Sequence, residues 1–427
     1  MDNKNSLKLN IVLSFLFGLF MATDVIYLFN IGSSYFTISE VYSTALLFFL
    51  LFTNRIDFKN KTYDCGKSFR VMLLYILFSS VMAFATFTST SLMYRYFVGI
   101  ISLAISLTAM INMMTLFEYR SFVINGLEAG IILNFVFSMI EYYSWNAMGV
   151  PFTTLYDIFP QPSFHMNEYN FSAEGLFLEP SHMIHFIAAV FPIWICCKFS
   201  FSVKSILFLV ATLFPVSLSG AGTSMAVWGS LAIIIVTKMK DVRMARLSTV
   251  AKMIILTTFL IILLLYFADS TIMRNVRETL DNYLTQAFEG SNVRDSSNTE
   301  RYMSMSTAAA LIPQYPLGCG WNMVHTLLEE STNLPVATAF NDIIEMTLEL
   351  GIGILLYIWF IFNTIRLLLK IKTDEAMGVA IALIAIFTMQ CLADNAFNPC
   401  MMMIFGFARC VIIKNGESSN DNETVHN

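Results

Sequence analysis

Charged residues are scarce in this chain, at 13% of its 427 positions, whereas hydrophobic residues make up 56% and include 39 phenylalanines. A water-soluble domain of this length cannot bury so much apolar surface, so the composition excludes an ordinary soluble enzyme. The sequence therefore predicts an all-α polytopic integral membrane protein.

Several familiar site types are missing. The seven cysteines are scattered, with neither a disulfide framework nor a CxxC pair, and no nucleotide-binding glycine loop occurs. No internal repeat indicates the paired halves of a transporter. We therefore expect no metal, no cofactor and no nucleic-acid partner.

Long hydrophobic runs predict about twelve transmembrane helices, the first of which we expect to remain as an uncleaved anchor. Some of these runs are shorter than the roughly 20 residues needed to cross a bilayer, so those helices are expected to be tilted or broken. The predicted spans are 9–29, 36–54, 71–90, 96–116, 122–146, 182–198, 205–219, 222–237, 253–268, 341–365, 376–394 and 397–413.

The distribution of lysine and arginine predicts the orientation, because cytoplasmic segments of membrane proteins are enriched in both. With the N-terminus inside, 20 of the 25 basic residues lie on the cytoplasmic side. The other five are Arg95, Arg274, Arg277, Arg294 and Arg301. Both termini are therefore expected in the cytoplasm.

This orientation divides the chain into four parts. Residues 1–268 hold the first nine spans and a smaller outer loop at 147–181, and residues 269–340 form a large, partly helical outer loop. The last three spans occupy 341–413, and 414–427 is expected to be a disordered cytoplasmic tail. Because everything predicted on the cytoplasmic side is short and basic, we expect the chemistry at the outer face.

The first candidate site opens the sixth span, where Glu179, Pro180, His182 and His185 occur together. Proline suits the first helical turn, and the three ionisable residues then follow at intervals of three, roughly along one side of the helix. A carboxylate beside an imidazole can tune a general base. The alternative is a helix cap followed by two hydrated interfacial histidines, and the spacing leaves both interpretations open.

The second candidate site is the small-residue stretch 217–224, which includes Ser219. Its residues allow a tight turn whose backbone N–H groups could face an anion. Close packing between helices through small residues is the alternative, and spacing alone favours it.

The third candidate site lies in the large outer loop. Ser297 and Glu300 have capping-box spacing, which predicts a helix from about Asn298 to Pro313 with Arg301 in its first turn. Arginine is suited to bidentate contact with phosphate oxygens, but pairing with the loop's acidic residues is an alternative. The residues grouped with Arg301 are Gly318, Gly320, Asn341, Asp342 and Glu345.

These motifs, in this order, resemble the bacterial O-antigen polymerase and ligase superfamily. The resemblance covers mainly residues 170–365, and the motifs that carry it are Glu-Pro-Ser-His at 179–182, Leu-Ser-Gly at 218–220, Arg301 followed by Gly318-Cys-Gly320, and Asn341-Asp342 leading to Glu349-Leu-Gly351. It implies a membrane glycosyltransferase (GT-C-like) fold, a location in the bacterial inner membrane, and a glycan carried on undecaprenyl pyrophosphate.

Two positions depart from the family pattern. Many relatives have an arginine after Leu-Ser-Gly-Ser, where this chain has Ala221 and Gly222, so that phosphate contact is in doubt. Ligases have a histidine directly before the loop-ending asparagine, and here that residue is Phe340. The resemblance therefore favours an O-antigen polymerase over a ligase.

The implied reaction joins lipid-linked repeat units at the periplasmic face without metal or nucleotide. Glu179 or His182 would act as the base and Arg301 would stabilise the departing pyrophosphate. Substrate-binding roles would fall to Arg294, Ser219, His185, Gly318, Gly320, Asn341 and Asp342. Expected partners are the lipid-linked glycan, membrane lipid and a possible chain-length regulator protein. The alternatives are a ligase acting on lipid A–core, or a flippase, which the outward placement of the loop arginines disfavours.

Overall fold

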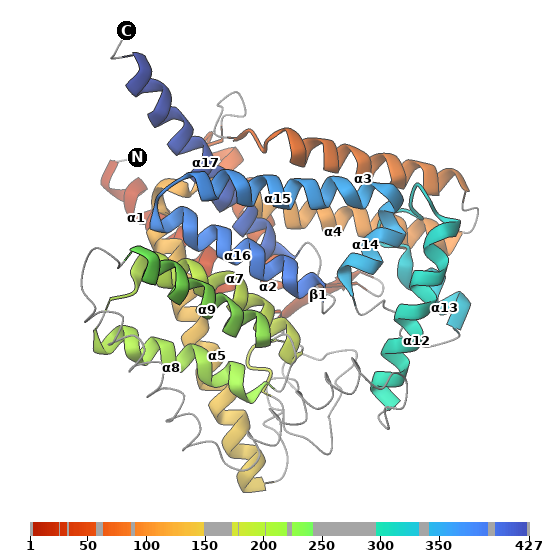
Figure 1. Cartoon of the computed structure of the whole chain (residues 1–427), viewed down its shortest axis with the longest axis horizontal. Coiled ribbons are helices and arrows are strands. Elements are labelled where there is room, and N and C mark those ends of the chain that lie inside the picture. Colours follow the sequence, from red (N-terminus) through yellow and green to blue (C-terminus); the bar gives the residue numbers. More distant parts are fainter. Residues whose placement is uncertain are drawn as a thin grey trace. The chain divides into compact units, whose positions relative to one another are not determined.

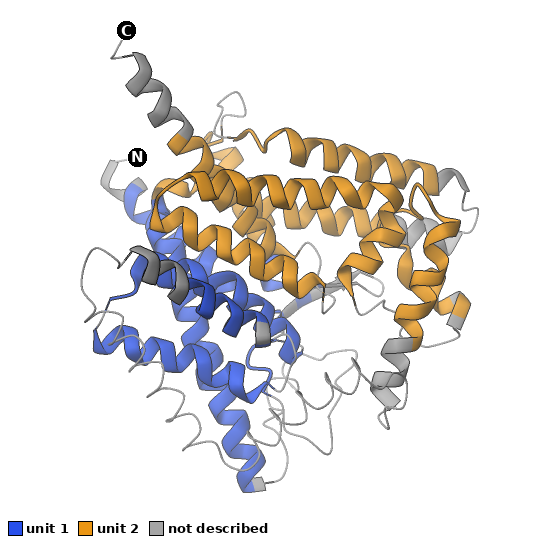
Figure 2. Ribbon diagram, in the orientation of Figure 1, with its two compact units in different colours: residues 1–42, 119–284 blue, residues 43–118, 285–427 orange. Residues whose placement is uncertain are grey.

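The computed structural model is almost entirely helical (Figure 1). It describes residues 3–24, 26–31, 34–56, 63–86, 90–148, 173–177, 179–200, 202–219, 224–241, 296–332, 341–391 and 398–424. The chain forms two compact units, each built from segments far apart in the sequence (Figure 2). Unit 1 consists of residues 1–42 and 119–284, and unit 2 of residues 43–118 and 285–427.

The described residues of unit 1 form the N-terminal helix, a small β-hairpin, the start of α2 and four further helices. The hairpin pairs Tyr27 with Thr37 and Phe29 with Phe36 in antiparallel register. The elements are α1 (Asn3–Phe20), β1 (Tyr27–Ile31), β2 (Ser34–Thr37), the start of α2 (Ile38–Phe52), α5 (Arg120–Met148), α7 (Pro180–Lys198), α8 (Val203–Leu218) and α9 (Ser224–Asp241).

The core of unit 1 is α7. Every side chain from Met183 to Cys196 is buried, because α5, α8 and α9 all pack against this helix. Nearby, α1 lies directly against α5, and a Cβ atom on Gly126 would come within 2.0 Å of the Phe15 carbonyl oxygen. Such close approach of two backbones through small residues is typical of helix pairs in membranes.

Unit 2 contains the remaining helices. They are the rest of α2, α3 (Lys67–Thr86), α4 (Thr90–Thr115), η2 (Phe117–Tyr119, whose last residue belongs to unit 1), α12 (Ser296–Leu311), η4 (Ile312–Gln314), α13 (Val324–Thr332), α14 (Asp342–Leu350), η5 (Gly351–Gly353), α15 (Ile354–Lys370), α16 (Asp374–Gln390) and α17 (Pro399–Thr424). Within the unit, α15 packs against α3 and α16, and α17 packs against α4.

The predicted membrane character is confirmed at a coarse level. Four of the described helices are long and apolar enough to cross a bilayer: Phe97–Thr115, Phe117–Ala147, Pro180–Lys198 and Asp342–Lys370, the last two being α7 and α14 to α15. Three shorter apolar helices, Leu7–Phe20, Ile38–Phe52 and Val203–Leu218, accompany them. The ninth predicted span, 253–268, lies outside the described residues.

The first predicted span differs from the structure. It was expected over 9–29, but α1 ends at Phe20, and the segment after it bonds to another part of the chain: Thr23 Oγ1 donates to the Leu176 carbonyl oxygen. The tenth predicted span corresponds to the candidate span Asp342–Lys370, within which α14 ends at Gly351, where φ is 56° and a Cβ would lie 2.2 Å from the Pro316 carbonyl oxygen. Finally, α17 continues to Thr424, through the segment expected to be a disordered tail.

Candidate functional site

The first turn of α7 presents its polar side chains as the sequence predicts. Glu179 occupies the N-cap position with extended backbone angles, and Pro180 begins the helix. One turn of helix separates His182 from His185, and their rings are stacked with centroids 6.5 Å apart. The predicted grouping of His182 with His185 on one side of the helix is therefore present.

The carboxylate that pairs with His182 comes from another part of the chain. Asp24, four residues after the end of α1, has Oδ2 2.6 Å from Nδ1 of His182. Both side chains are about one-quarter exposed, at 23% for His182 and 24% for Asp24. The pair is thus desolvated on most sides but still open to a substrate.

A single asparagine on α5 holds the backbone on both sides of this pair. Asn134 is fully buried, and its Nδ2 donates to the carbonyl oxygen of Ala22, two residues before Asp24. Its Oδ1 accepts from the backbone N–H of Leu176, in the segment that leads into α7. Because one side chain bonds to both segments, Asn134 fixes the chain near Asp24 relative to the chain that precedes His182.

Two further bonds reinforce this arrangement. The backbone N–H of Asp24 donates to the Leu176 carbonyl oxygen at 3.2 Å, so the two segments are also bonded directly. Glu141, on the next turns of α5, accepts from the backbone N–H groups of Glu174 and Gly175, each at 3.1 Å. The segment before α7 is therefore hydrogen-bonded to side chains of α5 at three consecutive residues, 174–176.

This geometry defines what His182 can do chemically. When the Asp24 carboxylate accepts from Nδ1–H, it selects the tautomer in which Nε2 carries the lone pair, and it stabilises the imidazolium that forms on protonation. The same logic orients the histidine in hydrolase triads. His182 is therefore equipped to remove a proton from a hydroxyl group placed at Nε2.

The other predicted residues of this helix have different environments. Glu179 is exposed, and its Oε2 accepts from the Ser181 hydroxyl at 3.1 Å rather than contacting His182. His185 is only 8% exposed, so its ring supports the His182 ring from the interior of unit 1. Of the two residues between which the sequence leaves the role of base open, the geometry favours His182.

The predicted anion-binding turn is described only at its start. Ser219 ends α8, is 1% exposed, and its hydroxyl donates to the Val216 carbonyl oxygen at 2.9 Å. The neighbouring Leu218 carbonyl accepts from the N–H of Ala173, which connects α8 to the segment before α7. Residues 220–223, which would form the turn, lie outside the described part of the chain.

In unit 2 the two loop glycines pack against the break between α14 and α15. Gly318 and Gly320 have φ angles of 93° and 96°, which favour glycine. A Cβ on Gly318 would lie 2.1 Å from the Glu349 carbonyl oxygen, and the N–H of Gly320 donates to that same oxygen at 3.1 Å. The backbone conformation and the close packing therefore explain both glycines, independently of the substrate contact predicted for them.

The side chain of Glu349 completes the same loop. It is 4% exposed, and Oε1 accepts from the N–H of Asn322 at 2.7 Å. Cys319 lies between the two glycines, and burial raises the pKa of its thiol well above the usual value, with the Glu349 charge adding to the shift. This loop is thus a closed structure whose cysteine is unreactive at neutral pH.

Asn341 and Asp342, predicted to position sugar hydroxyls, begin α14. Asn341 is its N-cap: Oδ1 accepts from the Ile344 N–H at 3.0 Å, and Nδ2 donates to the Cys391 carbonyl oxygen. Asp342 is 1% exposed. A nearby pair was not predicted from the sequence: Nε2 of His325 lies 3.5 Å from Oε1 of Glu345.

The predicted outer-loop helix is present, with a shifted start. It is α12, which begins at Ser296 and ends at Leu311 before Pro313. Arg301 therefore lies in the second turn rather than the first. The Arg301 side chain and all of Arg294 lie outside what the structure describes.

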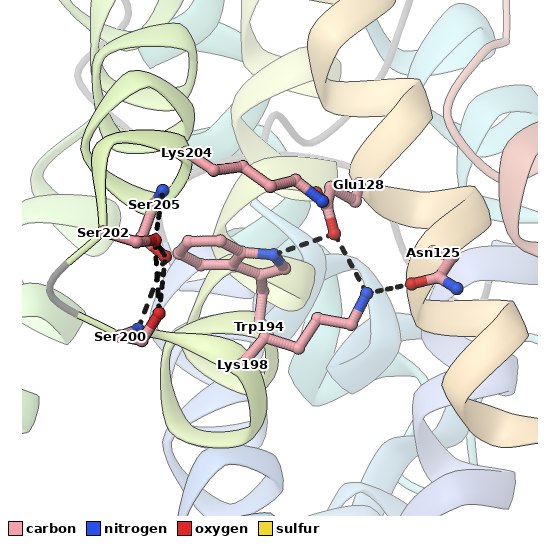
Figure 3. Close-up of polar contacts among 8 residues, drawn as sticks. All are labelled: Asn125, Glu128, Trp194, Lys198, Ser200, Ser202, Lys204 and Ser205. Carbon is pink, nitrogen blue, oxygen red and sulfur yellow. Dashed lines mark hydrogen bonds and ion pairs between the residues drawn. The ribbon is translucent and has the colours of Figure 1, made fainter.

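The opposite end of α7 carries a second polar cluster (Figure 3). Glu128 of α5 accepts from Lys198 at 2.9 Å and Trp194 at 3.3 Å, and its other oxygen lies 3.1 Å from Lys204. Lys198 also donates to Asn125. These bonds join α5, α7 and the start of α8, and we interpret this cluster as structural.

Comparison with protein-family models and with curated proteins finds no match for this chain. Within the described residues, no three histidine, cysteine, aspartate or glutamate side chains converge as a metal site would require.

Proposed function

We propose that this chain is a membrane glycosyltransferase that polymerises oligosaccharide repeats carried on undecaprenyl pyrophosphate into O-antigen or a related surface polysaccharide. The observation that carries the proposal is the Asp24–His182 pair at the N-terminal end of α7. The resemblance of residues 170–365 to O-antigen polymerases supplies the substrate class.

The side of the membrane on which His182 is expected to lie supports the proposal. The 19 residues of α7 extend about 28 Å, close to the thickness of the hydrocarbon core. Lys198 and Lys204 lie at one end, and Asp24 with His182 at the other. If the lysines are cytoplasmic, as lysine-rich ends usually are, His182 faces the periplasm, where lipid-linked repeats are joined.

In the proposed step, Nε2 of His182 removes the proton from a hydroxyl of the sugar that accepts the chain. The oxygen attacks the anomeric carbon of the donor glycan, a new C–O bond forms, and the bond from that carbon to the pyrophosphate breaks. Undecaprenyl pyrophosphate leaves with the electron pair, and Asp24 stabilises the imidazolium meanwhile. Arg301 and Arg294 of the outer loop are our candidates for stabilising the charge on the departing pyrophosphate.

The lipopolysaccharide ladder of a strain lacking this chain tests the proposal. Re-expression of the parent should restore the ladder, whereas His182→Gln and Asp24→Asn, at matched membrane abundance, should leave lipid A–core bearing one repeat. Loss of a general base typically costs on the order of 10²- to 10⁴-fold in rate. Cys197→Ala, at the other end of α7, serves as the control and should restore the full ladder.

Three other outcomes contradict the proposal. A full ladder with His182→Gln would remove His182 from the reaction. Lipid A–core without any repeat, together with polymer on the lipid carrier, would identify a ligase. Repeats trapped on the cytoplasmic leaflet would identify a flippase.

A further inference from the structure

Unit 2 contains a cavity of about 290 Å³ that is separate from the residues discussed so far. It lies where the start of α3 meets α4, α15 and α17 (Figure 1). One end is polar, with the N-terminal turn of α3 and Arg409 of α17. The other is aromatic, with Phe360 and Phe405.

Polar and apolar side chains lie close together in the lining. On α15, Trp359, Asn363 and Leu367 recur every four residues and so share one face. Eight residues of helix extend about 12 Å, so the cavity follows α15 for about two turns, and Phe360 lies against Phe69, two residues after Lys67, with ring centroids 5.0 Å apart. Free phosphate would use only the polar end, whereas a lipid with an acyl chain would use both.

Positive charge is in excess at the polar end. Arg409 donates through Nη2 to Asp64 Oδ2 at 3.0 Å, and Arg70 lies 3.4 Å from Oδ1 of the same carboxylate. Lys67, the first residue of α3, also lines the cavity and is exposed. Two arginines therefore pair with one carboxylate, and Lys67 brings a third positive charge to the cavity lining.

The pKa of the Asp64 carboxyl is lowered by this positive charge. Burial by itself would raise its pKa, but the N–H of Gly66 and the charges of Arg409 and Arg70 outweigh burial and lower it. Asp64 is therefore ionised at neutral pH and offsets one of the three cations. An anion at this end would be held by the remaining charge.

We propose that this cavity binds an anionic phospholipid, with the phosphodiester at Lys67 and Arg409 and the upper acyl chain along Trp359 and Phe360. Basic pockets between transmembrane helices on the cytoplasmic side commonly hold such headgroups. The volume is near the lower limit for ligand pockets, so it fits a headgroup and the first part of a chain rather than a whole lipid. The cavity is independent of the glycan site.

Trp359 provides the measurement, because bromine on an acyl chain quenches tryptophan emission on contact. The full-length protein is reconstituted in phosphatidylcholine vesicles containing a fixed fraction of either brominated phosphatidylglycerol or brominated phosphatidylcholine. The Trp359 signal is the difference between the parent and Trp359→Phe. We expect severalfold stronger quenching by the anionic lipid, because simple bilayer exposure of Trp359 would give equal quenching by both.

Variants test the charged end. Lys67→Gln should remove most of the preference for the anionic lipid, and because its side chain is exposed the fold should be kept. Arg409→Gln, assayed in preparations that elute as folded protein, should do the same. Lys370→Gln, at the end of α15 and outside the cavity lining, is the matched control and should keep the preference.

Two results would overturn the proposal. One is equal quenching by the two brominated lipids in the parent. The other is displacement of the anionic lipid by millimolar inorganic phosphate, which would indicate a site for free phosphate instead.

Discussion

At the scale of single residues, the central feature is an aspartate and a histidine that are 158 positions apart in sequence and 2.6 Å apart in space. Asp24 is part of a hydrophobic run that reads as a continuous span, and the sequence marks it only as an ionisable residue expected to face the interior. The pairing depends on where α1 ends and on the buried bonds of Asn134. Neither of these two features can be inferred from the spacing of residues in the sequence.

Ionisable side chains within the predicted spans are costly in lipid and are therefore expected to face the protein interior, and four of those that the structure describes are buried. Glu128, Glu141, Glu345 and Glu349 are all less than 10% exposed. The free-energy cost of exposing a charge to lipid was sufficient to predict that these side chains are buried. Asp394 lies outside the described residues.

Arg301 is the residue whose proposed role can be separated most clearly from a structural one. A guanidinium that holds pyrophosphate needs its planar fork, so Arg301→Lys should lose most polymerisation although the charge is kept. A surface ion pair is worth only about 1 kcal/mol or less, and lysine would largely replace it. The measurement is polymer length in cells at matched membrane abundance.

Arg274 is the control for this prediction, because its sequence context favours pairing with Glu278 on an amphipathic segment. If Arg301→Lys polymerises like the parent while Arg274→Ala does not, the wrong arginine has been assigned to the pyrophosphate.

At the scale of elements, α7 organises unit 1, since it carries His182 at one end and Lys198 at the other. Its position depends on α5, which supplies Asn134 and Glu141 near the first end and Glu128 near the second. The pair formed by α5 and α7 thus sets the distance between the two polar clusters.

Asn134→Ala tests whether this support matters for catalysis. The substitution leaves the Ala22 carbonyl and the Leu176 N–H without their partner, and each buried unsatisfied group costs about 1–3 kcal/mol. We expect a lower melting temperature and a fall in kcat at nearly unchanged KM, because the base is displaced while the substrate-binding loop is not. The check is steady-state kinetics of the purified variant at a temperature where it is folded.

Ser230→Ala is a suitable control, because this buried hydroxyl on α9 donates within its own helix, to the Ala226 carbonyl oxygen. A purely structural role for Asn134 would be indicated if the folded variant kept the parent's kcat.

Most described helices could be predicted from hydropathy, because a bilayer requires long apolar segments whatever their neighbours are. The start and end of α12 also followed from the capping box and Pro313 to within two residues. The details that could not be predicted are at tertiary contacts. The break at Gly351 depends on the close approach of Pro316, and the early end of α1 depends on bonds to Leu176.

The candidate site was predicted only in part, because its tertiary contacts could not be inferred from the sequence. His182 and His185 share a helix, so their spacing could be read directly. The glycines at 318 and 320 were recognised, but their packing on Glu349 involves a residue far along the chain. Tertiary partners of this kind need a structure or an alignment of relatives.

At the scale of the whole molecule, the account requires a fixed orientation in the membrane. Within each unit, contacts join helix ends that the basic residues assign to one side: Lys198 and Lys204 meet at Glu128, and Arg409 meets Asp64. Asn341 meets the Cys391 carbonyl at an end assigned to the periplasm. These contacts are consistent with the predicted topology.

Two exposed cysteines can test that orientation. Cys197 lies at the cytoplasmic end of α7 in this topology, and Cys391 follows the periplasmic end of α16. In chains that keep only one of the two, a membrane-impermeant maleimide added to cells with a permeabilised outer membrane should label Cys391 and not Cys197. Both should react after the inner membrane is dissolved, and the opposite pattern would reverse the topology.

The central claim is that this single chain makes glycosidic bonds between lipid-linked repeats, and purified protein tests it most directly. The protein is reconstituted in vesicles with repeat units on undecaprenyl pyrophosphate and no other enzyme or nucleotide. The account predicts a lengthening glycan on the lipid, one released undecaprenyl pyrophosphate for each bond formed, and neither product with His182→Gln. Movement of the intact repeat between leaflets with no bond formed, or equal polymer from His182→Gln, would contradict it.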